Sequence, residues 1–275
     1  MEFALNYSPE AADLLRAGRI AIDRFKCPDW PDMIAEASAL RPPYVHFPLQ
    51  AGGGAAVDWD RVAELLERTG TPHVNLHLAP LVAGHPDIPP DTLDPAHAAL
   101  LAERMVADTL AAVERFGPER VAVENIPYRP GGRFLRPAVD PALIRRVVEE
   151  TGCRLLLDLS HARITAASLG VEARAYVEEL PVERLAELHI TGIRQHNGRM
   201  EDHLPMTPDD WPHVAWAFER IRAGAWGEPR IVALEYGGTG PLFEWRSEAA
   251  VIAADVPRLY ALTHAEPQTQ AGERG

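Results

Sequence analysis

Residues Arg154–His161 read RLLLDLSH, and this stretch decides the fold. Three leucines lead into Asp158, and His161 follows three residues later. Burial of a carboxylate at the end of an apolar run is costly unless the group is paired or binds a metal ion. The stretch therefore predicts a buried strand that delivers a carboxylate and an imidazole to its C-terminal end.

Seven other segments follow the same pattern and alternate with amphipathic ones. Strands are expected at 3–7, 19–25, 44–49, 73–78, 120–126, 154–161, 185–190 and 230–236, and helices at 10–18, 31–40, 58–70, 95–116, 141–150, 171–180, 208–223 and 244–262. Continuous apolar strands are typical of a parallel sheet that is covered on both faces. The alternation predicts an α/β fold, a (β/α)₈ TIM barrel, as a single domain over residues 1–263, followed by a disordered C-terminal tail at 264–275. An open doubly wound sheet would require a glycine-rich turn after the first strand, and none is present.

Composition excludes several classes of protein. The net charge is −13, and no Lys/Arg-rich run occurs, so we expect neither nucleic acid nor a membrane surface as a partner. Cys27 and Cys153 form no disulfide framework and no cysteine-based zinc motif. With no signal peptide and no apolar run of about 20 residues, a cytoplasmic protein is expected.

Side chains with metal-binding atoms gather where the predicted strands end, which is where a barrel places its active site. They are His46, His77, Glu124 with Asn125, Asp158, His161, His189 and Glu235, with Asp202 and His203 in the loop after the seventh strand. A single histidine in a strand is more often structural, but ligand-type groups at six strand ends together predict a site. Mixed nitrogen and oxygen ligands suit iron, manganese or zinc.

Other reactive residue types are interpreted as structural. His85, His97, His196, His213 and His264 lie on predicted loops or helices, and His73 and Cys153 lie at the opposite end of the barrel. Cys27 follows the second strand near the mouth, where a small buried hydrophobe is the favoured interpretation. Ser160 lacks the GxSxG elbow of a serine hydrolase.

The order of motifs resembles a known family. HFPLQAG from His46, VNLHLAP from Val74, VENIPY from Val123, LLLDLSHARITA from Leu155, ELHITGI from Glu187, EDHLPM from Glu201 with DDW after it, and ALEYGG from Ala233 are similar to the multinuclear non-haem iron-dependent oxidative enzymes. This family, formerly domain of unknown function 692, belongs to the xylose-isomerase-like TIM barrel superfamily. The resemblance runs from about residue 44 to residue 240.

The resemblance implies a function and a ligand set. Two or three iron ions would be bound by His46, His77, Glu124, Asp158, His161, His189, Asp202, His203 and Glu235, with Glu124, Asp158 and Glu235 as catalytic carboxylates. The enzyme would use dioxygen to modify a precursor peptide, at a cysteine whose thiolate binds iron, and a partner protein would capture the peptide leader.

The chain departs from the family pattern at three places. Asp158-Leu159-Ser160-His161 stands where the family usually has Asp-Val-Asn-Asn. The family Asp-x-His aligns either to Glu201 and His203 or to Asp202 itself. Strand two reads IDRFKCPDW from Ile22, where family members often carry Glu-Asn.

Three alternatives stay open from the residues. A sugar isomerase or epimerase of the same superfamily would use Mn, Co, Mg or Zn, with Glu124 and Glu235 as opposed carboxylates for proton transfer. The second alternative is a metal-dependent phosphodiesterase, and the third is a non-catalytic metal-binding scaffold. The number of histidines favours a multinuclear site over a one-metal isomerase.

Overall fold

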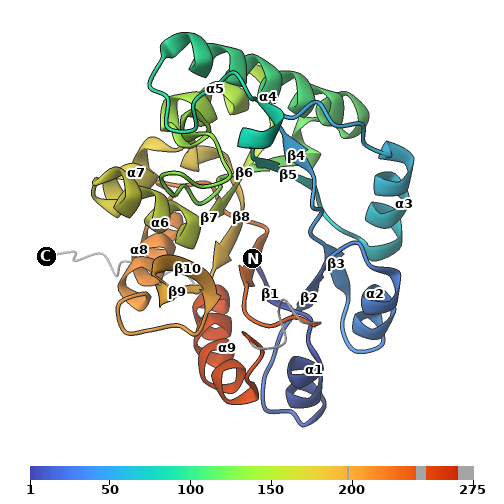
Figure 1. Ribbon diagram of the computed structural model, residues 1–275. Helices are drawn as coiled ribbons and strands as arrows, with labels where there is room; N and C mark the ends of the chain where they lie inside the picture. The colour runs from blue at the N-terminus through green and yellow to red at the C-terminus, as the bar shows by residue number, and fades with distance from the viewer. Residues whose placement is uncertain (197, 240–245, 266–275) are drawn as a thin grey trace, which may run out of the picture.

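The computed structural model describes residues 1–196, 198–239 and 246–265, and Figure 1 shows a central set of strands surrounded by helices. The central strands are β1 (Glu2–Asn6), β2 (Arg24–Cys27), β3 (Pro43–Val45), β4 (Gln50–Ala51), β5 (Val74–Leu78), β6 (Val121–Glu124), β7 (Arg154–Asp158), β8 (Leu185–Ile190) and β11 (Ile231–Leu234). Each hydrogen-bonded pair among them is parallel.

The strands close into a barrel through one continuous stretch of chain. Their order is β3-β2-β1-β11-β8-β7-β6-β5-β4, and only His46 to Leu49 separates β3 from β4. The amide of His46 donates to Cys27 O at 2.8 Å on one side, and the amide of His77 donates to Leu49 O at 2.9 Å on the other. Counted as one strand, this stretch completes the eight strands of the predicted (β/α)₈ barrel, which is confirmed.

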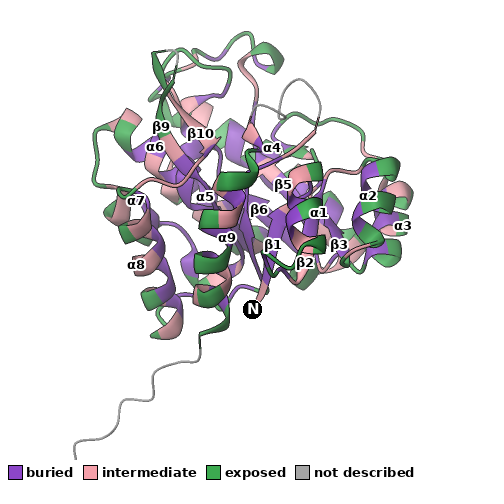
Figure 2. Ribbon diagram, turned by 90° about the horizontal axis from the view of Figure 1, so that it is seen from below, coloured by how far each residue is buried: buried purple, intermediate pink, exposed green. Residues whose placement is uncertain are grey.

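Helices cover the outside of the barrel and bury one face each (Figure 2). They are α1 (Pro9–Arg16), α2 (Pro31–Ser38), α3 (Trp59–Thr69), α4 (Pro95–Phe116), α5 (Pro141–Thr151), α6 (Leu159–Leu169), α7 (Ala173–Glu179), α8 (Trp211–Arg222) and α9 (Ala249–His264), with short 3₁₀ turns at Val82–Gly84, Pro118–Arg120, Arg136–Val139 and Val182–Arg184. The helix α3 illustrates why the sequence pattern succeeded. Asp58 caps its first turn, Gly70 ends it at φ 62°, and the apolar stripe between them is buried.

The second strand begins later than predicted, and this changes which residues reach the site. Residues 19–23 form no strand, because Asp23 turns the chain: its Oδ2 accepts from Phe3 N at 2.7 Å. Pairing of β2 with β1 starts at Arg24. Lys26 and Cys27, which lie beyond the predicted range of the strand, form its C-terminal end.

Two further predictions were wrong in their local structure. His161 was expected at a strand end, but α6 begins at Leu159, and Asp158 Oδ1 caps it by accepting from His161 N at 2.7 Å. The spacing of three is therefore that of a helix N-cap and its third residue. The polar segment from Gly192 was expected to be a loop, and it forms an antiparallel hairpin, β9 (Gly192–His196) with β10 (Arg199–Leu204).

At the C-terminus, α9 begins at Ala249 rather than near residue 244 and continues through His264. The predicted tail lies outside the described residues from 266 onward. Within the described chain, no helix combines the length and the apolar character that crossing a bilayer requires.

Candidate metal centre

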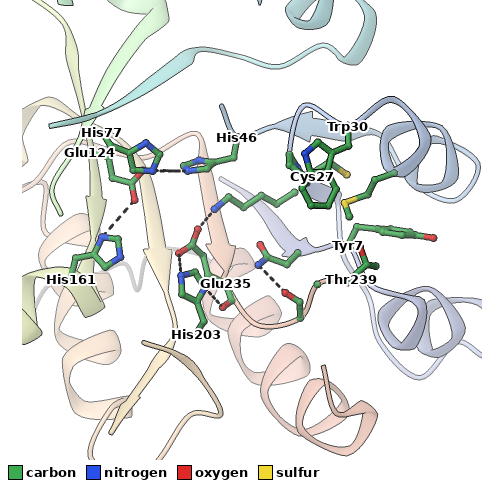
Figure 3. A pocket seen from close by; sticks show the side chains of 16 residues that line it. Tyr7, Cys27, Trp30, His46, His77, Glu124, His161, His203, Glu235 and Thr239 are labelled. Carbon is green, nitrogen blue, oxygen red and sulfur yellow. Dashed lines mark hydrogen bonds and ion pairs between the residues drawn. The ribbon is translucent and has the colours of Figure 1, made fainter. Parts of the chain in front are cut away.

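All nine predicted metal-binding side chains lie at the C-terminal end of the barrel. Register brings neighbours together, because His77 on β5 pairs with Glu124 on β6, and Asp158 on β7 pairs with His189 on β8. His46 comes from the stretch that closes the barrel. The remaining members are His161 on α6, Asp202 and His203 on β10, and Glu235 after β11. Figure 3 shows His46, His77, Glu124, His161, His203 and Glu235 around one cavity.

The first cluster is His46, His77 and Glu124. The two Nε2 atoms are 3.3 Å apart, and both approach Glu124 Oε2, at 3.4 Å from His46 and 3.1 Å from His77. Burial, and then the charge of Lys26, hold the pKa of His46 well below its usual value. Burial raises the pKa of Glu124, but His77 and His46 outweigh it and hold that pKa well below its usual range. A neutral imidazole beside an ionised carboxylate is the state that binds a metal ion.

The second cluster is His161, Asp202 and His203. His161 Nδ1 donates to Asn125 O at 2.9 Å, which leaves Nε2 toward Asp202 Oδ2 at 3.1 Å. Burial lowers the pKa of His161, but Asp158 and Asp202 raise it to about 10. Burial lowers the pKa of His203 to about 4. His161 is therefore protonated at neutral pH, and a metal ion here would displace its proton.

The hairpin supplies the second cluster through an irregular backbone. Its register shifts between Glu201 and Leu204, and His203 lies in the left-handed region at φ 54°, which is uncommon for a non-glycine residue. The bulge places Asp202 against His161, while His203 Nδ1 donates to Glu235 O at 3.0 Å. Asp202, and not Glu201, thus lies in the cluster; Glu201 pairs with Arg129 at 3.4 Å instead.

The third cluster is Asp158, His189 and Glu235. His189 Nδ1 lies 3.1 Å from Glu235 Oε1, and that same oxygen accepts from the ammonium group of Lys26. Burial lowers the pKa of Lys26 to about 8, although Glu124, Glu187 and Asp158 oppose the shift. Lys26 was not among the predicted site residues, because strand two was predicted only as far as Phe25.

Several buried atoms of the clusters have no hydrogen-bond partner among the described residues. They include Glu124 Oε2, Asp158 Oδ2 and His189 Nδ1. Native proteins rarely leave buried polar atoms unsatisfied, and a group that does so requires an explanation. Each of the three lies 3.1 to 3.6 Å from another member of the clusters, so ions bound among them would satisfy them. The donor set of imidazoles and carboxylates fits iron, manganese or zinc.

Beneath the clusters lies a buried carboxylate that sequence analysis missed. Glu187 Oε1 accepts from His189 Nε2 at 2.7 Å and from the Tyr44 hydroxyl at 2.8 Å, and Oε2 lies 2.5 Å from His73 Nε2. Such contacts orient a metal-binding imidazole and select its tautomer. The sequence did carry a signal, because Glu187 and His189 are two residues apart and share one face of the strand.

A cavity of about 290 Å³ joins the clusters to an apolar arm. Figure 3 shows Tyr7, Cys27 and Trp30 in that arm, away from His77, Glu124 and His161. Burial raises the pKa of Cys27 to about 12, so the thiol stays protonated. A broader hollow of about 780 Å³ shares His46 and His77 and continues past Trp30 to Arg129 and Arg133.

Other residues singled out in the sequence lie elsewhere. The five histidines assigned to loops or helices belong to none of the clusters found in the described chain: His85, His97, His196, His213 and His264. Ser160 Oγ donates to Thr191 O at 2.7 Å, so it joins α6 to the residue that follows β8 rather than acting as a nucleophile. His73 is at the opposite end from the mouth, as predicted, and supports Glu187 from below.

The chain matches one family model and is similar to several named proteins. The model of the family described as "RiPP precursor modification enzyme MbnB/TglH/ChrH" matches residues 45–222. A protein from Acaryochloris marina named UPF0276 protein AM1_3026 is 26% identical over 193 residues, which cover 68% of this chain and 62% of that protein. Another UPF0276 protein, from Paraburkholderia phytofirmans, is 35% identical over 105 residues, which are 38% of this chain and 32% of that protein. The chain thus spans less than two-thirds of the length of each of these relatives.

Two solved structures have the same fold. D-psicose 3-epimerase in the presence of D-fructose is 12% identical, with a TM-score of 0.56 over 96% of this chain and 98% of that one. A xylose isomerase-like TIM barrel protein from Mycobacterium smegmatis in complex with magnesium is 16% identical, with a TM-score of 0.50 over 95% and 96% of the two chains. At these identities the likeness establishes the barrel and no more.

Proposed function

Because the chain belongs to the family of RiPP precursor modification enzymes MbnB/TglH/ChrH, we propose that it is an iron-dependent oxidase that uses dioxygen to modify a precursor peptide at cysteine. RiPP denotes a ribosomally synthesised and post-translationally modified peptide. The observation that carries the proposal is the set of adjoining clusters in which imidazoles and carboxylates leave buried atoms unsatisfied. An isomerase that binds one metal ion would not need all of these clusters.

The proposed ligands divide by cluster. His46, His77 and Glu124 would hold one ion, and His161, Asp202 and His203 another. Asp158 and Glu124 also form a cluster with His161, so they lie between the two. Bound iron supplies the redox chemistry and the positive charge that favours a substrate thiolate over its thiol.

The surrounding residues have separate proposed roles. The apolar arm of the cavity would hold a substrate side chain next to the reacting cysteine and exclude water there. The broader hollow past Trp30 to Arg129 has room for the flanking peptide backbone. Glu124 and Asp158, the proposed catalytic carboxylates with Glu235, accept or return protons as the thiol binds. We assign leader recognition to a partner protein, as the resemblance to the family implies.

The test begins with anaerobic reconstitution using ferrous iron and elemental counting after desalting. A synthetic cysteine peptide is then supplied with dioxygen, and its serine counterpart serves as the control. We expect at least two irons per chain, oxygen consumption and an oxidised product with the cysteine peptide alone. Fewer than two irons, together with no oxidation of any cysteine peptide, would sink the proposal.

Matched variants link the chemistry to the clusters. His77→Ala removes a proposed ligand and should lower both the iron content and the oxidation of the peptide. His213→Ala removes a histidine on α8, outside the clusters, and should change neither. Epimerisation of D-fructose by the manganese-loaded protein, with no peptide oxidised, would instead favour the sugar epimerase alternative.

A further inference from the structure

Lys26 places a positive charge inside the candidate metal centre. It lies on β2 between Asn6 of β1 and Tyr44 of β3 in the register of the barrel, and its side chain is 6% exposed. Its ammonium group forms an ion pair with Glu235, whose side chain is 5% exposed. A buried lysine is costly unless it is paired, so this contact is built into the fold.

The ion pair uses the carboxylate oxygen that a metal ion at the third cluster would need. Glu235 Oε1 is bonded to Lys26 and lies 3.1 Å from His189 Nδ1, and both Glu235 and His189 belong to the cluster with Asp158. A metal ion would bind such an oxygen at roughly 2.0–2.2 Å. An ion there would then lie beside the ammonium group in a buried site, where like charges repel strongly.

Two of the other clusters do not share this ion pair, although the charge of Lys26 also lowers the pKa of His46 in the first of them. No ion pair of Lys26 with the residues of the His46–His77–Glu124 cluster or the His161–Asp202–His203 cluster occurs in the described chain. The charges of the side chains also favour two bound ions over three. Five carboxylates belong to the groups of side chains that could hold a metal ion: Glu124, Asp158, Glu187, Asp202 and Glu235. Two divalent ions and Lys26 carry five positive charges, whereas three ions and Lys26 would carry seven.

We propose that the ammonium group of Lys26 takes the place of a metal ion at the Asp158–His189–Glu235 cluster, so that the chain binds two ions. This inference rests on the metal centre of the proposed function. Lys26 then supplies a positive charge that holds Glu235 and leaves His189 to be oriented by Glu187. The two ions bind at the remaining clusters.

The experiment counts ions. Wild type, Lys26→Met and Lys26→Arg are loaded anaerobically with ferrous iron, and separately with Zn²⁺ alone, at pH 7, and metal per chain is measured after desalting. Methionine preserves much of the apolar stem without the charge, and arginine keeps the charge. We expect two ions in wild type and in Lys26→Arg, and three in Lys26→Met. Three ions in wild type, or two in a folded Lys26→Met, overturn the proposal.

A second measurement does not depend on a variant that folds. Anomalous diffraction from zinc-loaded wild-type crystals should show peaks at the first two clusters, and a peak among Asp158, His189 and Glu235 overturns the proposal. Failure of the proposed function is distinguishable. Three ions with peptide oxidation would refute only the role of Lys26, and the expected ion counts without oxidation would refute only the oxidase.

Discussion

His189 Nε2 and Glu187 Oε1 lie 2.7 Å apart on the same face of β8, so one strand supplies both a proposed ligand and the group that orients it. Glu187 is 1% exposed and also contacts His73 and Tyr44. Burial raises its pKa, but His189 and His73 outweigh burial and hold the pKa well below its usual value of 4.5. The carboxylate is thus ionised and paired inside the barrel.

Glu187→Ala should lower the free energy of unfolding by about 3–5 kcal/mol, because it leaves buried partners uncompensated. Urea denaturation of the metal-free protein at pH 7 measures the loss. Because the pKa of Glu187 is lower in the folded protein than in the unfolded one, its contribution to the free energy of unfolding is complete above about pH 4.5 and is lost as the pH falls. The difference in free energy of unfolding between wild type and Glu187→Ala should therefore narrow in stronger acid. Glu150→Ala, which removes an exposed ion pair with Arg146, should cost less than about 1 kcal/mol, and equal losses would contradict the assignment.

Metal binding should release a proton from His161. Its pKa of about 10 keeps it protonated at pH 7, whereas the pKa of His203 is about 4 and that imidazole is already neutral. Calorimetric titration with Zn²⁺ in buffers of different ionisation enthalpy counts the protons. His161→Asn should release about one proton fewer per chain than wild type, and zinc affinity at this cluster should fall about tenfold for each pH unit of acidification.

His203→Asn is the matched control for that measurement, because it removes a ligand from the same cluster without removing a protonated group. At zinc concentrations that saturate all three proteins to the same ion count, its proton release should equal that of wild type. An equal decrease in both variants would mean that His161 is neutral before metal binds.

The two cysteines should be unreactive in the folded protein. Both are buried, and burial raises the pKa of Cys27 to about 12 and that of Cys153 to about 11. Because the thiolate is the reactive form, a disulfide reagent at pH 8 should modify neither thiol before denaturation and both after it. Rapid reaction of a single thiol, lost in Cys27→Ala, would instead identify Cys27 as an accessible group of the cavity.

Trp30 should contribute to peptide binding and not to metal binding. It lines both hollows, yet its side chain is 48% exposed, which suits contact with a substrate. Trp30→Ala should raise KM for the cysteine peptide on the order of tenfold, with the metal content unchanged. Val171→Ala, another exposed apolar residue, lies outside these hollows and serves as the control. A loss of metal in Trp30→Ala would contradict this role.

The sequence by itself determined the barrel and most residues of the candidate site. Apolar runs that alternate with capped amphipathic segments encode strands and helices locally, as Asp58 and Gly70 do for α3. Parallel strands then bring their C-terminal ends to one rim, so residues such as His77 and Glu124 were expected to meet before any contact was known. The physical reason is that burial patterns and caps are short-range signals.

Only the tertiary structure decided how charges are paired across the barrel. Lys26 meets Glu235, and His73 meets Glu187, between strands far apart in the sequence. The bulge that turns Asp202 toward His161 likewise depends on the hairpin packing over α6. Such contacts depend on register and side-chain reach between distant strands, because a buried charge must find its partner wherever the fold brings one. No local pattern records that choice.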